Sequence, residues 1–211
     1  MKSTSIALLS FTILIFIGCG SDKVAHTTII NTDKSHTLQI DSKSINKKQT
    51  HAHPSINKAQ QKEFLTRINQ VRSERRSCGK YGSMGPVEQL VWSDKLYEAA
   101  YAHSYDMAKS RHFSHDGSGS RNDRAAVDMG LGCGSKLRDR MRYTDYRWRA
   151  IGENIAAGQQ SIQEVMEAWL RSDEHCKNLM SERFTEVGMA YYQLNEQFQQ
   201  PYWSQNFGCS M

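Results

Sequence analysis

The chain has 211 residues and a formal net charge of +5. This length allows one folded domain with a tail, and not two domains of ordinary size. The small positive excess favours anionic partners, but it is too weak to indicate a nucleic-acid-binding protein, and the sequence contains no P-loop, G-x-G-x-x-G or zinc-finger spacing. We therefore expect no nucleic-acid partner.

Residues 1–18 have the pattern of a bacterial signal peptide. Lys2 supplies the positive end, and residues 6–17 form a mostly apolar run that is shorter than the roughly 20 residues of a membrane span. The run ends in Phe16-Ile17-Gly18-Cys19, which resembles the lipobox of bacterial lipoproteins. The resemblance implies cleavage before Cys19 and lipid modification of its thiol. An ordinary signal peptide in which Cys19 is incidental is the alternative.

A lipidated Cys19 would tether the protein to a membrane outside the cytoplasm. Lipoproteins with Asp directly after the cysteine tend to stay in the inner membrane. Gly20 stands there instead, so we expect the outer membrane if the cell has two membranes. Residues 19–55 contain no aromatic residue and are rich in polar side chains, which predicts a disordered tether. The folded domain is therefore expected at 56–211.

Two amphipathic helices are predicted at the start of this domain. The first begins near Asn57 and is expected to end around residues 77–79. The second follows Ser93, which is a good N-cap with Asp94 in the first turn. Its buried face includes His103, which we interpret as a core-facing, hydrogen-bonded histidine. The apolar residues that define the two faces are Phe64, Leu65, Ile68 and Val71, then Leu96, Ala99, Ala100 and Met107.

The segment 136–149 carries six Lys or Arg against two Asp, with three aromatic residues between them. A solvated loop face is the favoured interpretation, and a patch that binds an anionic surface is the alternative. Further on, Ser161-x-x-Glu164 is a capping box that opens a helix. Strand-like stretches at 187–192 and 202–207 are separated by a short polar connection that suits an antiparallel hairpin. Helices first and a hairpin last favour an α+β fold.

Four segments together resemble the bacterial branch of the CAP superfamily, which includes the cysteine-rich secretory, antigen 5 and pathogenesis-related proteins. They are His112-Phe-Ser-His115-Asp-Gly117, Gly152-Glu153-Asn154-Ile155-Ala156-Ala157-Gly158, Trp169-Leu-Arg-Ser172-Asp-Glu-His175-Cys-Lys-Asn178-Leu179 and Tyr202-Trp203-Ser204-Gln205-Asn206-Phe207-Gly208. The resemblance implies a three-layer α–β–α sandwich with a central antiparallel sheet. It also implies a cleft where two histidines meet one or two acidic residues.

Carried over by motif, the cleft residues are His115, Glu153 and His175. Many eukaryotic members have a second glutamate where this chain has Ser172. Two imidazoles and one carboxylate could bind Zn²⁺ or another divalent cation and leave a position for water. The alternative is a hydrogen-bonded network that holds the loop after Phe113 on the sheet. A third arrangement has Ser172 as nucleophile, His175 as base and Glu153 as the group that orients the base, but it lacks the sequence context of an activated serine.

We expect the cleft to be the functional site of the domain. The favoured hypothesis is a non-enzymatic, membrane-tethered module that binds a lipid, a polysaccharide or an envelope protein. A metal-dependent hydrolase that uses the same cleft is the alternative, and a toxin-like or adhesin-like protein acting on a host is a third. No catalytic residue is assigned.

The remaining four cysteines suggest two disulfides in an oxidising compartment, with three possible connectivities. We predict Cys78–Cys133, between two expected loop ends, and Cys176–Cys209, between a helix end and a neighbouring strand end.

Overall fold

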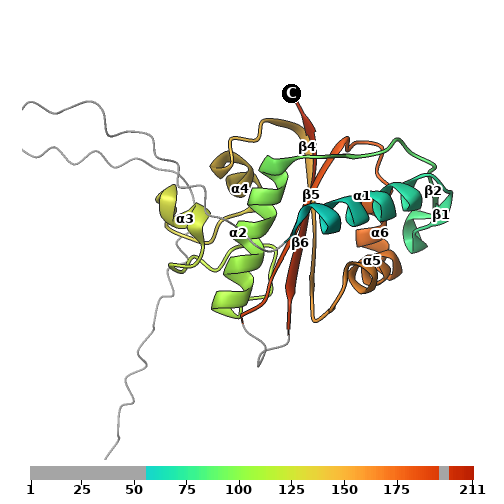
Figure 1. Ribbon diagram of the computed structural model, residues 1–211. Helices are drawn as coiled ribbons and strands as arrows, with labels where there is room; N and C mark the ends of the chain where they lie inside the picture. The colour runs from blue at the N-terminus through green and yellow to red at the C-terminus, as the bar shows by residue number, and fades with distance from the viewer. Residues whose placement is uncertain (1–55, 195–199) are drawn as a thin grey trace, which may run out of the picture. The chain divides into compact units, whose positions relative to one another are not determined.

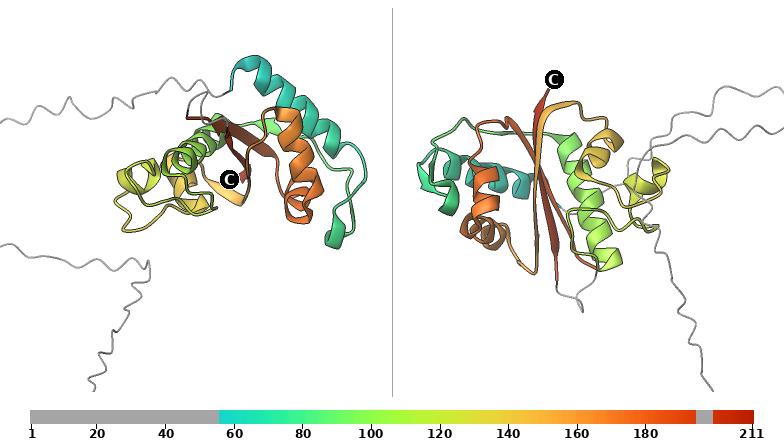
Figure 2. Two further views of the ribbon diagram at one scale, coloured as in Figure 1. Left: turned by 90° about the horizontal axis from the view of Figure 1, so that it is seen from below. Right: turned by 180° about the vertical axis from the view of Figure 1, so that it is seen from behind.

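The structure is a computed structural model that describes residues 56–194 and 200–211. The predictions on the signal peptide, Cys19 and the tether therefore lie outside the described residues. The domain has three layers, with a sheet between two groups of helices (Figures 1 and 2). The predicted α+β, three-layer sandwich is confirmed. No helix in the described part of the chain is long and apolar enough to cross a membrane.

The central sheet has the strand order β3-β5-β6-β4. The strands are β3 (Val91–Trp92), β4 (Trp148–Ala157), β5 (Glu186–Tyr192) and β6 (Tyr202–Ser210). Strands β5 and β6 form the predicted antiparallel hairpin, and β4 is antiparallel to β6. The short β3 runs parallel to β5, so the sheet is mixed rather than purely antiparallel. Two residues are too few to show a strand periodicity, which is why the sequence did not reveal this edge.

Helices α2 (Asp94–Ser110), α3 (Arg124–Asp128) and α4 (Leu137–Tyr143) form one outer layer (Figure 1). Helix α2 begins after Ser93 as predicted, and every residue of its expected buried face is buried, His103 included. The helix packs so closely on β5 that a Cβ at Gly188 would clash with the backbone of α2. This close packing fixes the height of His103 above the sheet.

Helices α1 (Lys58–Arg72), α5 (Ile162–Arg171) and α6 (Asp173–Leu179) cover the other face (Figure 2). The largest core cluster lies here and includes Trp169 of α5. The Trp169 indole N–H donates to the carbonyl of Ile155 at 3.2 Å. Asn178 of α6 donates to the carbonyl of Glu153 at 3.2 Å. Because β4 is the edge strand, these two side chains satisfy carbonyls that no further strand pairs with, and they block that edge.

The first helix ends at Arg72, several residues earlier than predicted. The Arg72 guanidinium is buried and donates to the carbonyls of Glu88 (2.7 Å), Leu179 (2.7 Å) and Ser181 (3.0 Å). These bonds tie the end of α1 to two distant loops. The chain then forms a small hairpin from β1 (Arg76–Ser77) and β2 (Ser83–Met84), with a 3₁₀ turn, η1 (Gly79–Tyr81), between them.

The predicted disulfides are wrong. Cys78 is bonded to Cys176, with 5.4 Å between their Cα atoms, and Cys209 is a free cysteine. The prediction placed Cys78 at the end of the first helix, but it lies in the small hairpin, and η1 packs directly on α6. Cys209 lies on β6 beside Ala150 of β4, away from the hairpin. Neither Cys78–Cys133 nor Cys176–Cys209 is therefore formed.

Candidate functional site

A cavity of about 460 Å³ opens where three segments meet: the loop after α2, strand β4 and helix α6. It is lined by Phe113, Ser114, His115, Asp116, Ile155 and His175. This volume lies within the usual range of small-ligand sites. The structure thus brings both predicted histidines to one cavity, although they are 60 residues apart in the sequence.

Glu153 lies beneath this cavity rather than on its wall. Its carboxylate is almost fully buried, and each oxygen has a partner: His115 Nδ1 lies 2.9 Å from Oε1, and Arg140 Nη2 lies 2.8 Å from Oε2. Burial alone would raise the pKa of this carboxyl group. The charge of Arg140 and the hydrogen bond with His115 outweigh burial and hold the pKa of Glu153 well below its usual range. Glu153 is therefore an anion inside the fold.

Arg140 of α4 is the residue that the sequence analysis missed. Its side chain is 1% exposed and also donates to the carbonyls of Ser135 (2.8 Å) and His115 (3.0 Å). Within the basic segment 136–149, which the favoured interpretation left in solvent, this one arginine is buried. The signal that could have found it is spacing, because Leu137, Arg140, Met141 and Thr144 recur at helical intervals and place Arg140 on the apolar face.

His103 lies on the inner side of the same cluster. Its Nε2 is 3.0 Å from the carbonyl of Ser114 and 3.9 Å from Glu153 Oε1. Burial, and then the charge of Arg140, lowers the pKa of His103 to about 3. His103 is therefore a neutral, hydrogen-bonded core histidine, as predicted. With its amide oriented to satisfy both atoms, Asn206 of β6 also donates to Glu153 Oε2 at 3.2 Å.

The two cavity histidines differ in their protonation. The hydrogen bond to Glu153 raises the pKa of His115, although burial opposes this shift. Burial lowers the pKa of His175, and the charge of His115 lowers it further. On acidification His115 is therefore protonated before His175. The cavity passes through a state with one imidazolium and one neutral imidazole.

His175 is positioned by α6 and a network of buried amides. The Asn154 side chain donates to the His175 carbonyl at 3.4 Å and to Gln205 Oε1 at 2.9 Å. Asn178, on the same helix as His175, donates to Asn154 Oδ1 at 2.9 Å. The network ties α6 to β4 and β6, so His175 is held at a defined height over the sheet.

Ser172 is not in the cavity wall. It lies in extended backbone at the junction between α5 and α6, and no capping hydrogen bond forms from its side chain. Ser172 precedes the first turn of α6 and so does not lie on the same helix face as His175. The structure does not bring Ser172 together with His175 and Glu153 as a nucleophilic triad.

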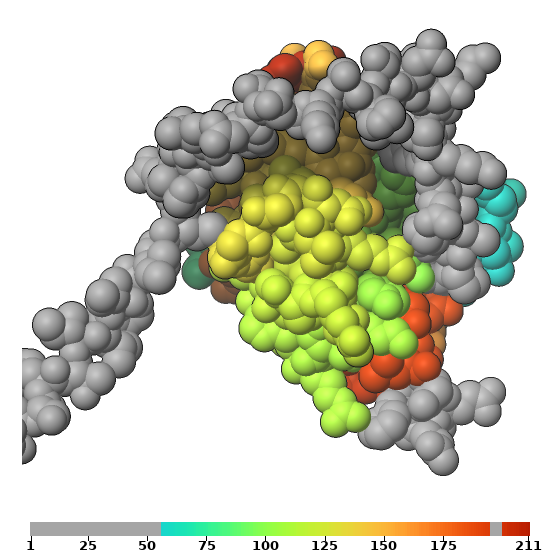
Figure 3. Space-filling view, turned by 90° about the vertical axis from the view of Figure 1, so that its left-hand side faces the viewer, coloured from blue at the N-terminus to red at the C-terminus, as the bar shows by residue number. Residues whose placement is uncertain are grey.

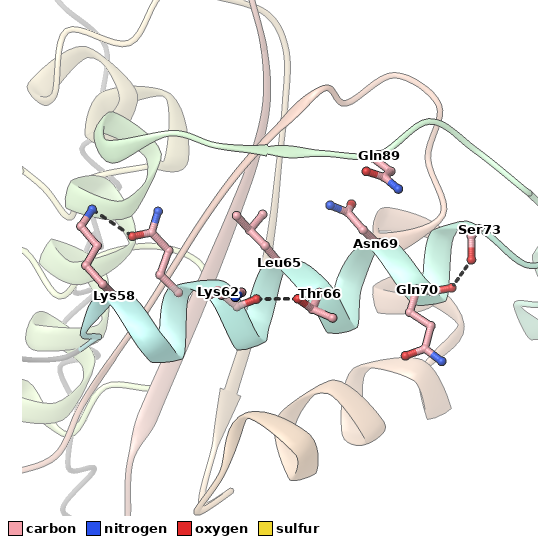
Figure 4. Close-up of a pocket in the computed structure, with 9 residues that line it drawn as sticks. Lys58, Lys62, Leu65, Thr66, Asn69, Gln70, Ser73 and Gln89 are labelled. Atoms are coloured by element: carbon pink, nitrogen blue, oxygen red, sulfur yellow. Dashed lines mark hydrogen bonds between the residues drawn. The ribbon is translucent and has the colours of Figure 1, made fainter.

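A larger hollow of about 600 Å³ runs along α1 in the other layer (Figure 4). Its lining is polar except for Leu65, and it contains no histidine or acidic residue. One of its amides, that of Asn69, is occupied in holding Leu90 through two backbone hydrogen bonds. Of these two hollows, only the smaller one is lined by histidine and acidic side chains.

The model of the cysteine-rich secretory protein family, CAP, matches residues 65–207. These residues contain the cavity and most of the domain. The chain belongs to the CAP family. The histidines and glutamate expected from the motifs all lie inside the matched region.

Two proteins of Bacillus subtilis (strain 168) are similar to this CAP domain over 121 residues, or 57% of the chain. YkwD is 29% identical and is covered over 40% of its length, and the membrane protein YlbC is 28% identical and is covered over 29%. The chain thus spans less than half the length of these relatives. The likeness is to a part of each of them.

Solved structures show the same fold. An extracellular protein containing an SCP domain from Bacillus anthracis str. Ames is 26% identical, with a TM-score of 0.52, over 70% of this chain and 39% of that chain. An outer surface protein from Borrelia burgdorferi has a TM-score of 0.55 at 18% identity, over 74% of this chain and 98% of that chain. The second likeness concerns the fold alone.

The donor set of this CAP domain fits a metal only in part. Among residues 56–194 and 200–211, no group of three or more His, Cys, Asp or Glu is arranged to hold a metal ion. Glu153 does not fit the role of ligand, because Arg140 and His115 occupy its two oxygens. His115 and His175 both line the cavity, and neutral imidazoles are common metal ligands. The predicted three-residue ligand set is thus reduced to two histidines.

Proposed function

We propose that this CAP domain is an extracytoplasmic binding module that holds a divalent cation, such as Zn²⁺, between His115 and His175. One observation carries the proposal: His115 bonds through Nδ1 to buried Glu153, at 2.9 Å from Oε1. A histidine that donates one ring N–H to a carboxylate keeps its other nitrogen for a metal, and the carboxylate orients the ring. Glu153 is then the outer partner of a ligand and not a ligand itself.

The cation would supply positive charge and open coordination positions in the cavity. Imidazole nitrogens suit zinc, and two protein ligands leave positions for groups of a bound molecule. Phe113 and Ile155 add apolar wall beside the histidines. A ligand with a metal-binding polar group and an apolar part fits this composition, and lipids, polysaccharides and envelope proteins all offer such groups.

Zinc calorimetry on the recombinant domain, residues 56–211, tests the site. His115→Ala and His175→Ala should each remove most of the binding. Glu153→Gln keeps a hydrogen-bond acceptor but loses the charge. It should weaken zinc binding roughly 10–100-fold, as is typical when a residue that orients a metal ligand is replaced. His112→Ala is the matched control, because this exposed histidine is not part of the cavity wall.

The pH dependence gives a second criterion. Zinc needs neutral imidazoles, and the pKa of His115 is raised, so protons compete first at His115. Binding should therefore weaken as the pH falls from about 7.5 to about 5.5, across the histidine range. Absence of zinc heat at the higher pH, or equal binding by the wild type and His175→Ala, would contradict the metal site.

A metal-dependent hydrolase is the second candidate for the same cavity. The observation that favours it is the Glu153–His115 pair, in which a buried carboxylate orients an imidazole that could move a proton. A hydrolysis screen with and without zinc separates the two functions. Zinc-dependent turnover that His175→Ala abolishes would identify an enzyme, and zinc binding without turnover supports the binding module.

The extracytoplasmic location is part of the proposal. It is supported by the leader-like residues 1–18, the lipobox ending at Cys19 and the similarity to an extracellular protein of Bacillus anthracis. Metabolic labelling with palmitate should mark the wild-type chain and not Cys19→Ser. Unlabelled wild-type protein would rule out the lipid anchor, and with it the outer-membrane attachment.

A further inference from the structure

The face formed by α3 and α4 combines exposed apolar side chains with positive charge. Figure 3 shows the α3 part of this face, in yellow, toward the viewer. Val127 is 55% exposed and Met129, directly after α3, is 37% exposed. Helix α3 packs into the fold through the buried Ala125 and Ala126. Val127 and Met129 therefore contribute exposed apolar surface that the core does not use.

The charge around these residues is strongly one-sided. Residues 121–149 contain eight Lys or Arg and four Asp, an excess of four, against +5 for the whole chain. Two of the four aspartates, Asp123 and Asp139, are buried, and so is Arg140. Arg138 and Arg142 lie one turn apart on α4 and both approach Asp139 Oδ1, at 3.8 and 3.4 Å, while their side chains remain 59% and 58% exposed. Solvent on this face thus meets mainly guanidinium and ammonium groups.

Aromatic rings continue the face onto α2. The Arg124 guanidinium lies 4.6 Å from the ring centre of Tyr105. Lys109 lies over both Tyr105 (5.8 Å) and Tyr192 (5.6 Å). Tyr105 and Tyr192 are half-buried beside these cations. Tyrosine, arginine and lysine are the side chains that favour the headgroup region of a bilayer.

We propose that this face, consisting of Val127, Met129, Arg138 and Arg142, binds the surface of a bilayer that contains anionic lipid. The apolar pair would enter the boundary between headgroups and acyl chains, and the arginines would contact phosphates. The charge excess selects an anionic bilayer over a neutral one. The exposed Val and Met distinguish a bilayer from a soluble polyanion, which offers no apolar layer. The proposal is independent of the histidine cavity and of lipidation at Cys19.

Vesicle sedimentation with the recombinant domain, residues 56–211, tests the proposal. The domain should bind vesicles of phosphatidylcholine mixed with phosphatidylglycerol, bind pure phosphatidylcholine weakly, and dissociate as salt is raised. Removing a basic side chain near an anionic membrane weakens binding about fivefold. Arg138→Gln with Arg142→Gln should therefore reduce the affinity by about 25-fold. Val127→Ser with Met129→Ser should reduce it even in low salt.

Matched controls lie on other parts of the domain. Lys58→Gln with Lys62→Gln removes the same charge from α1, in the opposite layer, and should leave most of the affinity intact. Val91→Ser changes a valine that is 61% exposed on β3, and it should bind like the wild type. An equal loss in the lysine control would overturn the proposal, because net charge alone would then explain the binding. Tighter binding to a DNA fragment than to vesicles would also overturn it.

Discussion

Glu153 shows how one buried charge organises a site. Four side chains approach its carboxylate, from the loop after α2 (His115), from α2 itself (His103), from α4 (Arg140) and from β6 (Asn206). A buried carboxylate is tolerated only with good partners, because taking it out of water is costly. The contact with Glu153 also raises the pKa of His115, and so it affects the protonation state of the cavity. Stability and the chemistry of the site thus depend on one residue.

Arg140→Met should destabilise the domain by about 3–5 kcal/mol, because it leaves Glu153 as an unpaired buried anion. Adding Glu153→Gln should recover part of this loss, since the uncompensated charge is then absent. Urea unfolding of the two variants measures the difference. Arg138→Met, a change in an exposed neighbour, should cost no more than about 0.5 kcal/mol. Equal losses at Arg138 and Arg140 would contradict the role of the ion pair.

At the scale of elements, the small hairpin holds α6 from the side opposite to the amide network. Besides the disulfide, Asp173 accepts from the Lys80 backbone N–H at 3.0 Å, and the Tyr81 hydroxyl donates to Glu174 at 2.6 Å. The Lys177 ammonium lies 4.2 Å from the centre of the Tyr81 ring. These contacts attach the hairpin to α6, the helix that carries His175. The small hairpin therefore supports the cavity indirectly, through its contacts with α6.

Replacing Cys78 and Cys176 together by Ala should lower the stability by about 4–5 kcal/mol, from the chain entropy of a cross-link that spans 98 residues. The loss of zinc affinity should be smaller than in His175→Ala, because the amide network still holds α6. Thermal unfolding and zinc calorimetry give the two readouts. Cys209→Ala is the control and should change neither by much.

Peptide mapping without reductant checks the pairing itself. We expect a peptide containing Cys78 joined to one containing Cys176, and an alkylated peptide containing Cys209. A link between Cys176 and Cys209 would show that the described pairing is wrong.

For the whole molecule, acid stability should be limited by the buried histidine. The pKa of His103 is about 3 in the fold and about 6.5 in an unfolded chain, so its contribution is complete above pH 6.5 and is lost as the pH falls toward 3. At about pH 5 the loss is about 2 kcal/mol. Glu153 adds a loss below its unfolded pKa, because its folded pKa is depressed. His115 acts in the opposite direction and weakly, since it is half-exposed: its contribution falls as the pH rises through its raised pKa.

Urea midpoints between about pH 7.5 and about pH 4 measure this slope. His103→Gln should flatten the decline between about pH 6.5 and about pH 5, since the group that must take up a proton is gone. His112→Ala, at an exposed position, should leave the slope unchanged. A wild-type domain that is equally stable at both ends of the range would contradict a neutral, buried His103.

The sequence by itself determined the parts that depend on neighbouring residues. Helix α2 with its buried face, helix α5 after Ser161 and the β5–β6 hairpin follow from periodicity, caps and turn spacing, which act over a few residues. The motifs around His115, Glu153 and His175 also indicated the family and the layered fold before any geometry was known.

Only the tertiary structure decided how distant residues pair. Cys78 bonds to Cys176 because α1 ends at Arg72 and the following hairpin packs on α6, an arrangement that no local pattern encodes. Arg140, on a helix of the outer layer, is buried with Glu153 of the sheet as its ion-pair partner. An arginine is expected in solvent unless a partner of opposite charge is buried with it. That partner is supplied by the packing of the whole domain, and this is why the ion pair under the cavity became visible only in the fold.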